Sequence, residues 1–398
     1  MVDQRNHSLI QFAPISIILA AWMPQIGYRM LVQNTPFSDV AAEVYGLVAL
    51  AIFCYVCGAL VGRKADRAYL LLRSVAPTYN VVSPGSMAPS GFYSKFRFVV
   101  VSLALTFFLN SFLLQLLNGV DMAAMRDDAL SEWSEGGVLV KLMAVGVNSL
   151  ACMLLLCISL EHRSRRKVNF PLVLLFVFVC VAAYARTLLL IGLFILMTRL
   201  VADHAAPVRL VVKLLSGFIL LFLLLALFGK DNSANGNGVL AIVMAHAEIY
   251  FFGGVAGLNN FFVYGEPRYN TLLSIPRFIQ GVLPLTGDAP PQYFDFVETP
   301  QPLNVFTAIY PPFHDFGAAG VAILFFFYGT VTATACRKFA TSDSYVWQVV
   351  AGFLLYATAM SIFDDQFIRA LPVFLIFISA AVLFSILRPY LESQVRTN

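Results

Sequence analysis

Arginines near the predicted membrane boundaries are the residues of this sequence with the clearest potential for chemistry: Arg186, Arg268, Arg277 and Arg369. A guanidinium group keeps its charge at any ordinary pH and matches phosphate oxygens with paired hydrogen bonds. A charge at the membrane is costly and is a functional candidate by default. Several such groups at one interface could bind the pyrophosphate of a lipid-linked substrate.

The four arginines differ in how easily a structural role accounts for them. Arg369 follows Asp365 by four positions, so an i,i+4 ion pair is sufficient. Arg268 lies beside a proline in what reads as open loop, and Arg277 could face the headgroups from an interfacial helix. No acidic residue lies within ten positions of Arg186. Arg186 is therefore the strongest functional candidate.

A polar and aromatic segment before a late apolar run supplies the second set of candidates: Asn304, Thr307, Tyr310, His314 and Asp315. His314 is a natural general base near neutral pH. Asp315 has two equal interpretations, a catalytic carboxylate or the N-cap of the following helix.

No metal or cofactor is predicted. The outward carboxylates are scattered, whereas a magnesium site needs several that converge. His246-x-Glu248 has no accompanying cysteine pair, and Cys54-x-x-Cys57 lies within an apolar run without further ligands. We expect all six cysteines to be free thiols.

The composition determines which elements must position these residues. Of 398 residues, 59% are hydrophobic and 12% charged, and the mean hydropathy is +0.79. Average soluble domains carry about 25% charge, so the sequence predicts an all-α polytopic membrane protein. The net charge of +4 is too small to indicate nucleic acid as a partner.

Apolar runs of about 20 residues are long enough to cross a bilayer. They predict about ten transmembrane helices, near residues 9–28, 40–61, 98–118, 138–160, 168–185, 187–201, 210–228, 318–335, 345–363 and 368–387. With both termini cytoplasmic, most Lys and Arg fall in cytoplasmic segments, as the positive-inside rule requires. His162 and His204 are then expected in solvated cytoplasmic turns.

Two regions depart from a regular series of spans. The apolar run 168–200 is interrupted only by Arg186, which predicts a tight hairpin with Arg186 at its outer tip. The long outward loop contains residues 239–263, interpreted as a re-entrant or interfacial helical pair broken at Gly253-Gly254. An amphipathic interfacial helix is expected over 272–283. The predicted organisation is transmembrane helices 1–7 in 1–228, the large loop in 229–317, and helices 8–10 with a cytoplasmic tail in 318–398.

The order of these spans, loops and motifs along the sequence resembles that of the O-antigen polymerase (Wzy) family of oligosaccharide repeat-unit polymerases. Three parts carry the resemblance: the mid-chain helix start Ala185-Arg186-Thr187, the large outward loop, and the segment Asn304–Gly320 with its Asp-Phe-Gly-x-x-Gly. The layout covers nearly the whole chain, but the motifs cover only about 185–190 and 304–320. The family's paired arginine-glycine loop repeats are not present as clean copies.

The resemblance implies a GT-C-like glycosyltransferase of the bacterial inner membrane, acting without a metal on undecaprenyl-pyrophosphate-linked oligosaccharides at the periplasmic face. A chain-length regulator and a flippase are the implied partners beside the bilayer. Arg186, His314 and Asp315 are then the expected catalytic residues. The expected substrate-binding residues are Arg277, Arg268, Tyr310, Asn304 and Thr307, with Tyr310 either stacking on a sugar ring or anchoring the membrane interface.

Two other functions fit the same layout. An O-antigen ligase would use the same donor with a lipid A-core acceptor, and the Asp-Phe-Gly-x-x-Gly segment is the main reason to prefer a polymerase. A lipid-linked oligosaccharide flippase would be a non-enzymatic alternative. Transporters commonly show internal repeats and mid-membrane polar residues, whereas the polar groups of this sequence gather on the outward side.

Overall fold

The computed structural model of the protein describes residues 4–31, 40–64, 92–113, 117, 138–165, 169–183, 185–203, 216, 239–282, 291, 294–297, 303–342 and 344–395. Within these residues the chain is helical, apart from loops and one isolated bridge between Val297 and Leu303. Six of the described helices are long and apolar enough to span a membrane: α1 (Gln4–Leu31), α2 (Ala42–Lys64), α4 (Phe92–Phe108) with the π-helix η1 (Leu109–Leu113), α7 (Val138–Arg165), α13 (Tyr310–Ser342) and α16 (Leu371–Val395). The protein is therefore a helical polytopic membrane protein.

Two further apolar helices are shorter, α8 (Phe170–Ala182) and α14 (Tyr345–Met360). Helix α9 (Arg186–Asp203) follows α8 after a short turn, which confirms the predicted hairpin. Every span predicted within the described residues coincides with a helix, but the span predicted over 210–228 lies outside them. The total of ten spans stays a prediction.

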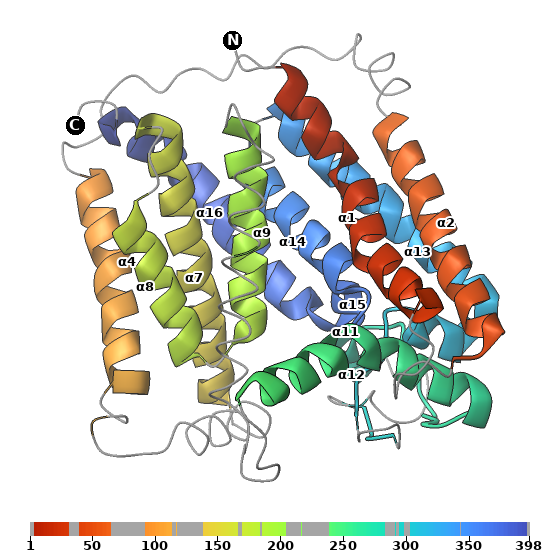
Figure 1. Ribbon diagram of the computed structural model, residues 1–398. Helices are drawn as coiled ribbons and strands as arrows, with labels where there is room; N and C mark the ends of the chain where they lie inside the picture. The colour runs from red at the N-terminus through yellow and green to blue at the C-terminus, as the bar shows by residue number, and fades with distance from the viewer. Residues whose placement is uncertain are drawn as a thin grey trace.

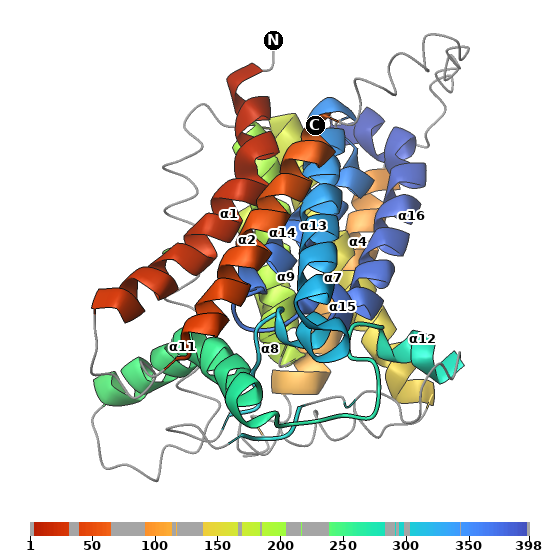
Figure 2. The same ribbon diagram turned by 90° about the vertical axis from the view of Figure 1, so that its right-hand side faces the viewer.

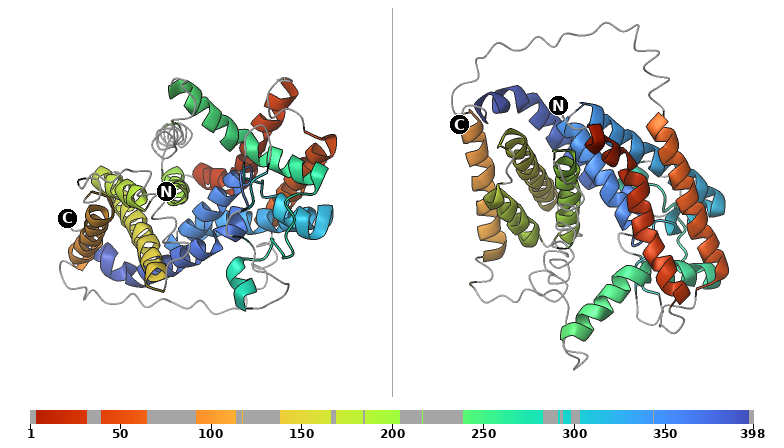
Figure 3. Two further views of the ribbon diagram at one scale, coloured as in Figure 1. Left: turned by 90° about the horizontal axis from the view of Figure 1, so that it is seen from below. Right: turned by 45° about the horizontal axis from the view of Figure 1, so that its top comes forward.

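Helices α1 and α4 run downward in Figure 1, whereas α2, α7 and α13 run upward. The first turn of α1 and the last turn of α16 lie at the same, upper end of the bundle. We call the lower end the α11 end, because α11 (Val239–Tyr264) crosses it beneath α1, α2 and α13 (Figures 1 and 3). The other end is the opposite end.

The apolar interior is divided into two main clusters. One is built by α4, α7, α8, α9, α14 and α16, and the other by α1, α2, α11, α13 and the loops at the α11 end. Helix α14 joins the two, because Val349 and Phe353 pack in the first cluster while Leu354 and Leu355 pack with α1, α9 and α13. Figure 1 shows α14 between the two groups of helices.

Helices α2 and α13 approach closely through glycines. A Cβ atom on Gly58 would lie 2.0 Å from the Phe326 carbonyl oxygen, and one on Gly329 would lie 2.0 Å from the Tyr55 oxygen. The hydroxyl of Thr330 donates to the Gly58 carbonyl at 3.1 Å. Small residues with hydroxyl cross-links are the usual way in which membrane helices associate.

Helix α11 differs from the predicted helical pair. It continues through Gly253 and Gly254 without the expected break. A Cβ atom on Gly254 would lie 2.3 Å from the Ile362 carbonyl oxygen, and one on Gly257 would lie 2.3 Å from that of Val305. These two glycines therefore serve close packing of other backbone segments on the helix, and the prediction of a break was wrong.

Candidate functional site

The candidate site lies at the α11 end. Here the backbone of residues 303–309 forms hydrogen bonds with α11 on one side and with the turn after α14 on the other. The Thr307 amide donates to the Gly254 carbonyl at 3.3 Å, and the Ala308 amide donates to the Ser361 carbonyl at 2.8 Å. These backbone bonds fix the start of α13, which follows at Tyr310. The candidate residues predicted in segment 304–315 are thus carried by a backbone that hydrogen bonds hold in place.

Tyr310 forms the centre of an aromatic cluster. Its side chain is fully buried, with ring centroids 4.5 Å from Phe306, 4.9 Å from Phe261 and 5.1 Å from Phe294. The hydroxyl donates to the Pro267 carbonyl at 3.0 Å. A buried ring has no free face for a sugar, so the structure is inconsistent with the predicted stacking role.

Thr307 is also fully buried, and its hydroxyl oxygen accepts a hydrogen bond from the Ile309 amide at 3.3 Å. This position is inconsistent with direct substrate binding and indicates a role in turning the chain into α13. Asn304 is partly exposed, next to the Val297–Leu303 bridge. Of these two residues only Asn304 remains a candidate for substrate contact.

His314 and Asp315 hold the loop 269–274 against α13. The Tyr269 amide donates to His314 Nε2 at 3.3 Å, so the proton of the neutral ring is on Nδ1, which lies 2.7 Å from Asp315 Oδ1. The Leu273 amide donates to Asp315 Oδ1 at 3.0 Å and the Ser274 amide donates to Oδ2 at 2.7 Å. Asp315 thereby orients the imidazole, as a carboxylate does in many acid–base sites.

The alternative of Asp315 as a helix N-cap is wrong. Asp315 lies inside α13, before the kink at Gly317, where φ is 62°. Its oxygens accept from amides of another segment, Leu273 and Ser274. Since positive φ is accessible to glycine without steric cost, Gly317 allows the chain to turn from the His314 segment into the long part of α13.

Arg268 and Arg277 are both exposed at the α11 end. The Arg268 Nε donates to the Gly265 carbonyl at 2.8 Å, within a turn where Gly265 has φ 69°. Arg277 is the first residue of α12 (Arg277–Val282). The helix expected over 272–283 is therefore shorter than predicted, because Pro276 restricts Ile275 to non-helical conformations.

Arg186 is the first residue of α9, and the start of this helix lies at the α11 end (Figure 1). Its side chain is outside the described part of the structure. The next residue, Thr187, forms a side-chain hydrogen bond with Tyr356 of α14. The start of α9 is thus connected to α14, and a turn follows α14 at residues 361–365.

That turn contains Asp364 and Asp365, and the spacing predicted Asp365 as the ion-pair partner of Arg369. Arg369 Nη1 lies 2.9 Å from Asp364 Oδ2, so the predicted pair with Asp365 was wrong. Asp365 instead caps the four-residue helix α15 (Gln366–Arg369) and accepts a hydrogen bond from Tyr328 at 2.9 Å. The i,i+4 rule failed because the acceptor oxygens of Asp365 are occupied by amides and a phenol.

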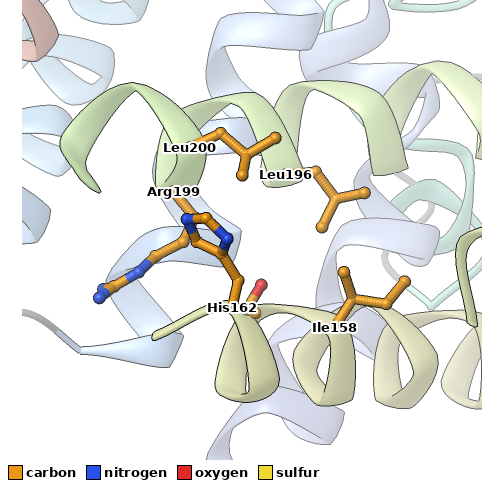
Figure 4. A pocket seen from close by; sticks show the side chains of 6 residues that line it. Ile158, His162, Leu196, Arg199 and Leu200 are labelled. Atoms are coloured by element: carbon orange, nitrogen blue, oxygen red, sulfur yellow. The ribbon is translucent and has the colours of Figure 1, made fainter. Parts of the chain in front are cut away.

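The opposite end holds a second buried ionisable group. His162 is 2% exposed and lies 3.8 Å from Asp203, so the expectation that it is solvated was wrong. His204 is outside the described residues. Figure 4 shows His162 and Arg199 beside a small cavity that also touches Ser159. The cavity has room for about one water molecule, which is too little for a substrate.

Among the described side chains, no group of three His, Cys, Asp or Glu residues could hold a metal ion. The six cysteines lie in α2, α7, α8 and α13 as free thiols, as expected. The candidate site consists of arginines, a histidine and carboxylates at the α11 end.

Comparison of the chain with protein-family models, with curated proteins and with solved structures gave no match.

Proposed function

We propose that the protein is an integral membrane glycosyltransferase that polymerises undecaprenyl-pyrophosphate-linked oligosaccharide repeat units. The observation that carries this proposal is that the start of α9, at Arg186, lies at the same end of the bundle as the hydrogen-bonded pair His314 and Asp315. Figure 2 shows α11 at the foot of the bundle, lying across the direction of α2 and α13. A crosswise helix at this level would lie at the membrane interface, where a lipid-linked substrate presents its pyrophosphate.

The chemical step joins two substrates at this end. An acceptor hydroxyl oxygen attacks the anomeric carbon of the donor sugar, and the bond from that carbon to the lipid pyrophosphate breaks. The hydroxyl proton goes to His314, whose Nε2 must first release the Tyr269 amide at 3.3 Å. Arg186, with Arg277 or Arg268, stabilises the charge of the departing pyrophosphate.

The placement of these groups favours an enzyme over a flippase. A flippase needs a polar passage through the bundle, whereas the candidate residues lie at one end. In this proposal the protein lies in the inner membrane, with the α11 end facing the periplasm and both termini in the cytoplasm. This orientation follows from the positive-inside rule.

The test is the length distribution of surface polysaccharide in a deletion strain complemented with variants. Arg186→Ala should abolish long chains while the protein remains in the membrane, leaving lipid A-core capped with one repeat unit. Arg388→Ala is the control, because Arg388 lies near the end of α16 with its guanidinium over the Tyr345 ring. It should retain the full ladder.

Other results of the same experiment identify the alternatives. Polymer that accumulates on its lipid carrier would identify a ligase. Repeat units trapped on the cytoplasmic side would identify a flippase. A normal ladder in the Arg186→Ala strain would remove the residue on which the proposal depends.

A further inference from the structure

The loop of residues 265–275 joins α11 to α12 at the foot of the bundle and is bonded to the start of α13 (Figure 2). The Tyr269 amide of this loop donates to His314 Nε2 at 3.3 Å, and the side chain of His314 is 11% exposed. The nitrogen that carries the free lone pair of the ring therefore faces the loop. In this arrangement a backbone amide occupies the position that a substrate hydroxyl would need.

Two other contacts hold the loop on α13, one before and one after Tyr269. The Pro267 carbonyl accepts from the Tyr310 hydroxyl at 3.0 Å. The amides of Leu273 and Ser274 donate to the two carboxylate oxygens of Asp315, at 3.0 and 2.7 Å. Neither contact uses His314 Nε2, so both remain when that nitrogen gains a proton.

The contact at Tyr269 depends on the protonation state of His314. A neutral imidazole has one donor and one acceptor nitrogen, whereas an imidazolium has two donors. Nδ1 lies 2.7 Å from Asp315 Oδ1, so Nδ1 donates to the carboxylate in both states. A second proton is therefore placed on Nε2, where its N–H meets the N–H of Tyr269. Two donors that face each other form no hydrogen bond, and the amide loses its acceptor.

We infer that His314 is a proton-operated latch for the loop 265–275. With a neutral ring the loop is closed over Nε2, and with a protonated ring residues 268–272 are released while the two ends stay docked. The inference deepens the proposed function and rests on it for one step. When Nε2 takes the proton of the acceptor hydroxyl, the imidazolium keeps the loop open until that proton passes to water. The loop therefore closes only after the base has been regenerated.

The groups that surround His314 do not account for a response between about pH 5 and 8, where histidine side chains change charge. The titratable groups that face the ring are Asp315 and Tyr310 on α13 and Tyr269 on the loop, while α11 contributes the uncharged ring of Phe261. Burial raises the pKa of Tyr269 to about 12, which is far above this range. Two further charged groups act on Tyr269 rather than on the imidazole: Asp295 and Arg369.

The experiment measures amide hydrogen exchange by mass spectrometry on the full chain in phosphatidylcholine nanodiscs, at pH 8 and pH 5.5. The rates are divided by the chemical exchange rate at each pH, so that they report opening alone. Protection of the Tyr269 amide should fall about tenfold at pH 5.5, as expected for a hydrogen bond whose donor loses its partner. Residues 320–335 of α13 should stay equally protected at both pH values. Unchanged protection at Tyr269 would overturn the inference.

His314→Gln separates the latch from a general effect of pH. Glutamine keeps an acceptor oxygen and an amide donor but gains no proton in this range, so the Tyr269 amide should be equally protected at pH 8 and pH 5.5. Asp365→Asn is the matched control, because Asp365 also lies at the α11 end and burial raises its pKa to about 7. This control should retain the response of the wild type. A response that is lost in Asp365→Asn and kept in His314→Gln would contradict the latch.

A measurement on the wild type keeps the test independent of the folding of these variants. Exchange of the histidine C2 hydrogen, followed in the same samples, reports the titration of His314 directly. Its midpoint should coincide with the midpoint at which protection of the Tyr269 amide is lost. Midpoints more than about one pH unit apart would refute the latch.

Two combined outcomes distinguish this inference from the proposed function. A pH response at Tyr269 together with a normal polysaccharide ladder in the deletion strain would retain the latch and remove the proposed function. A lost ladder without a pH response at Tyr269 would remove the latch and retain the proposed function.

Discussion

At the scale of single residues, Asp365 is the most unusual acid of the described structure. Its side chain is 0% exposed, and Oδ1 accepts from the amides of Phe367 and Ile368 at 3.1 and 3.4 Å. Burial raises the pKa of Asp365 to about 7, partly offset by the Tyr328 hydroxyl and increased by the adjacent Asp364. A carboxyl group outside the long spans thus titrates near neutrality.

This shift predicts how stability depends on pH. The unfolded pKa of Asp is about 3.9, so the folded protein binds the proton more tightly between pH 4 and 7. Stability contributed by Asp365 is therefore present at low pH and lost as pH rises through about 7. The melting temperature of the purified protein should be higher at pH 5 than at pH 8.

Asp365→Asn isolates this contribution, because the amide resembles the protonated acid and keeps an oxygen for the Phe367 amide. We expect its melting temperature to equal or exceed that of the wild type at pH 8, with a flatter pH profile. Asp295→Asn is the control, since Asp295 is exposed. An unchanged pH profile in Asp365→Asn would refute the assignment.

At the scale of elements, the contact between α2 and α13 depends on which glycines face the partner helix. Gly58 faces the Phe326 carbonyl, whereas a Cβ atom on Gly46 of the same helix would have no neighbour within 4 Å. Both glycines lie in the same apolar run, and their sequence surroundings do not distinguish them. Only the packed structure shows that Gly58 faces a neighbouring backbone and that Gly46 does not.

Gly58→Ala should therefore separate α2 from α13 or force a shift of their backbones. Overpacking of this kind lowers the free energy of unfolding by about 1–3 kcal/mol. We therefore expect the melting temperature to fall by several degrees. Gly46→Ala should leave the melting temperature unchanged or slightly raised, since alanine is the better helix former. Equal effects of the two substitutions would contradict the close contact at Gly58.

The helices could be predicted from the sequence because apolar runs of sufficient length have few other stable forms in a membrane. The hairpin around Arg186 followed from the same reasoning. The continuity of α11 could not, because Gly253-Gly254 is equally compatible with a break and with a close contact. The partner of Arg369 was missed because it depends on which carboxylate oxygens the backbone of α15 occupies.

At the scale of the whole molecule, the two ends of the bundle differ in character. The α11 end carries loops, the short helix α12 and the His314–Asp315 pair. The opposite end carries two ion pairs, the buried Glu161 with Arg97 and the partly exposed Asp203 with Arg199. The gathering of outward polar residues was predictable from hydropathy. The hydrogen bonds of His314 and Asp315 were not, because they join α13 to residues 269–274, which lie more than forty positions earlier.

The proposed orientation of these ends in the inner membrane predicts how introduced cysteines react. Glu266 lies exposed at the α11 end and Ser342 lies exposed at the opposite end. In a variant without native cysteines, Glu266→Cys should react with a membrane-impermeant maleimide added outside the inner membrane. Ser342→Cys should react only after the membrane is permeabilised. The reverse pattern would invert the orientation and place the candidate site in the cytoplasm.

The position of α14 between the two groups of helices has a consequence for the synthesis of the protein. Domains and helices emerge from the ribosome in chain order, and α14 (Tyr345–Met360) is made after every other helix except α15 and α16. Until then, the faces of α9, α1 and α13 that α14 will cover are exposed to lipid or to an insertion chaperone. The interior is therefore completed only at the end of insertion, so a chain truncated before Tyr345 should be recognised by membrane proteases.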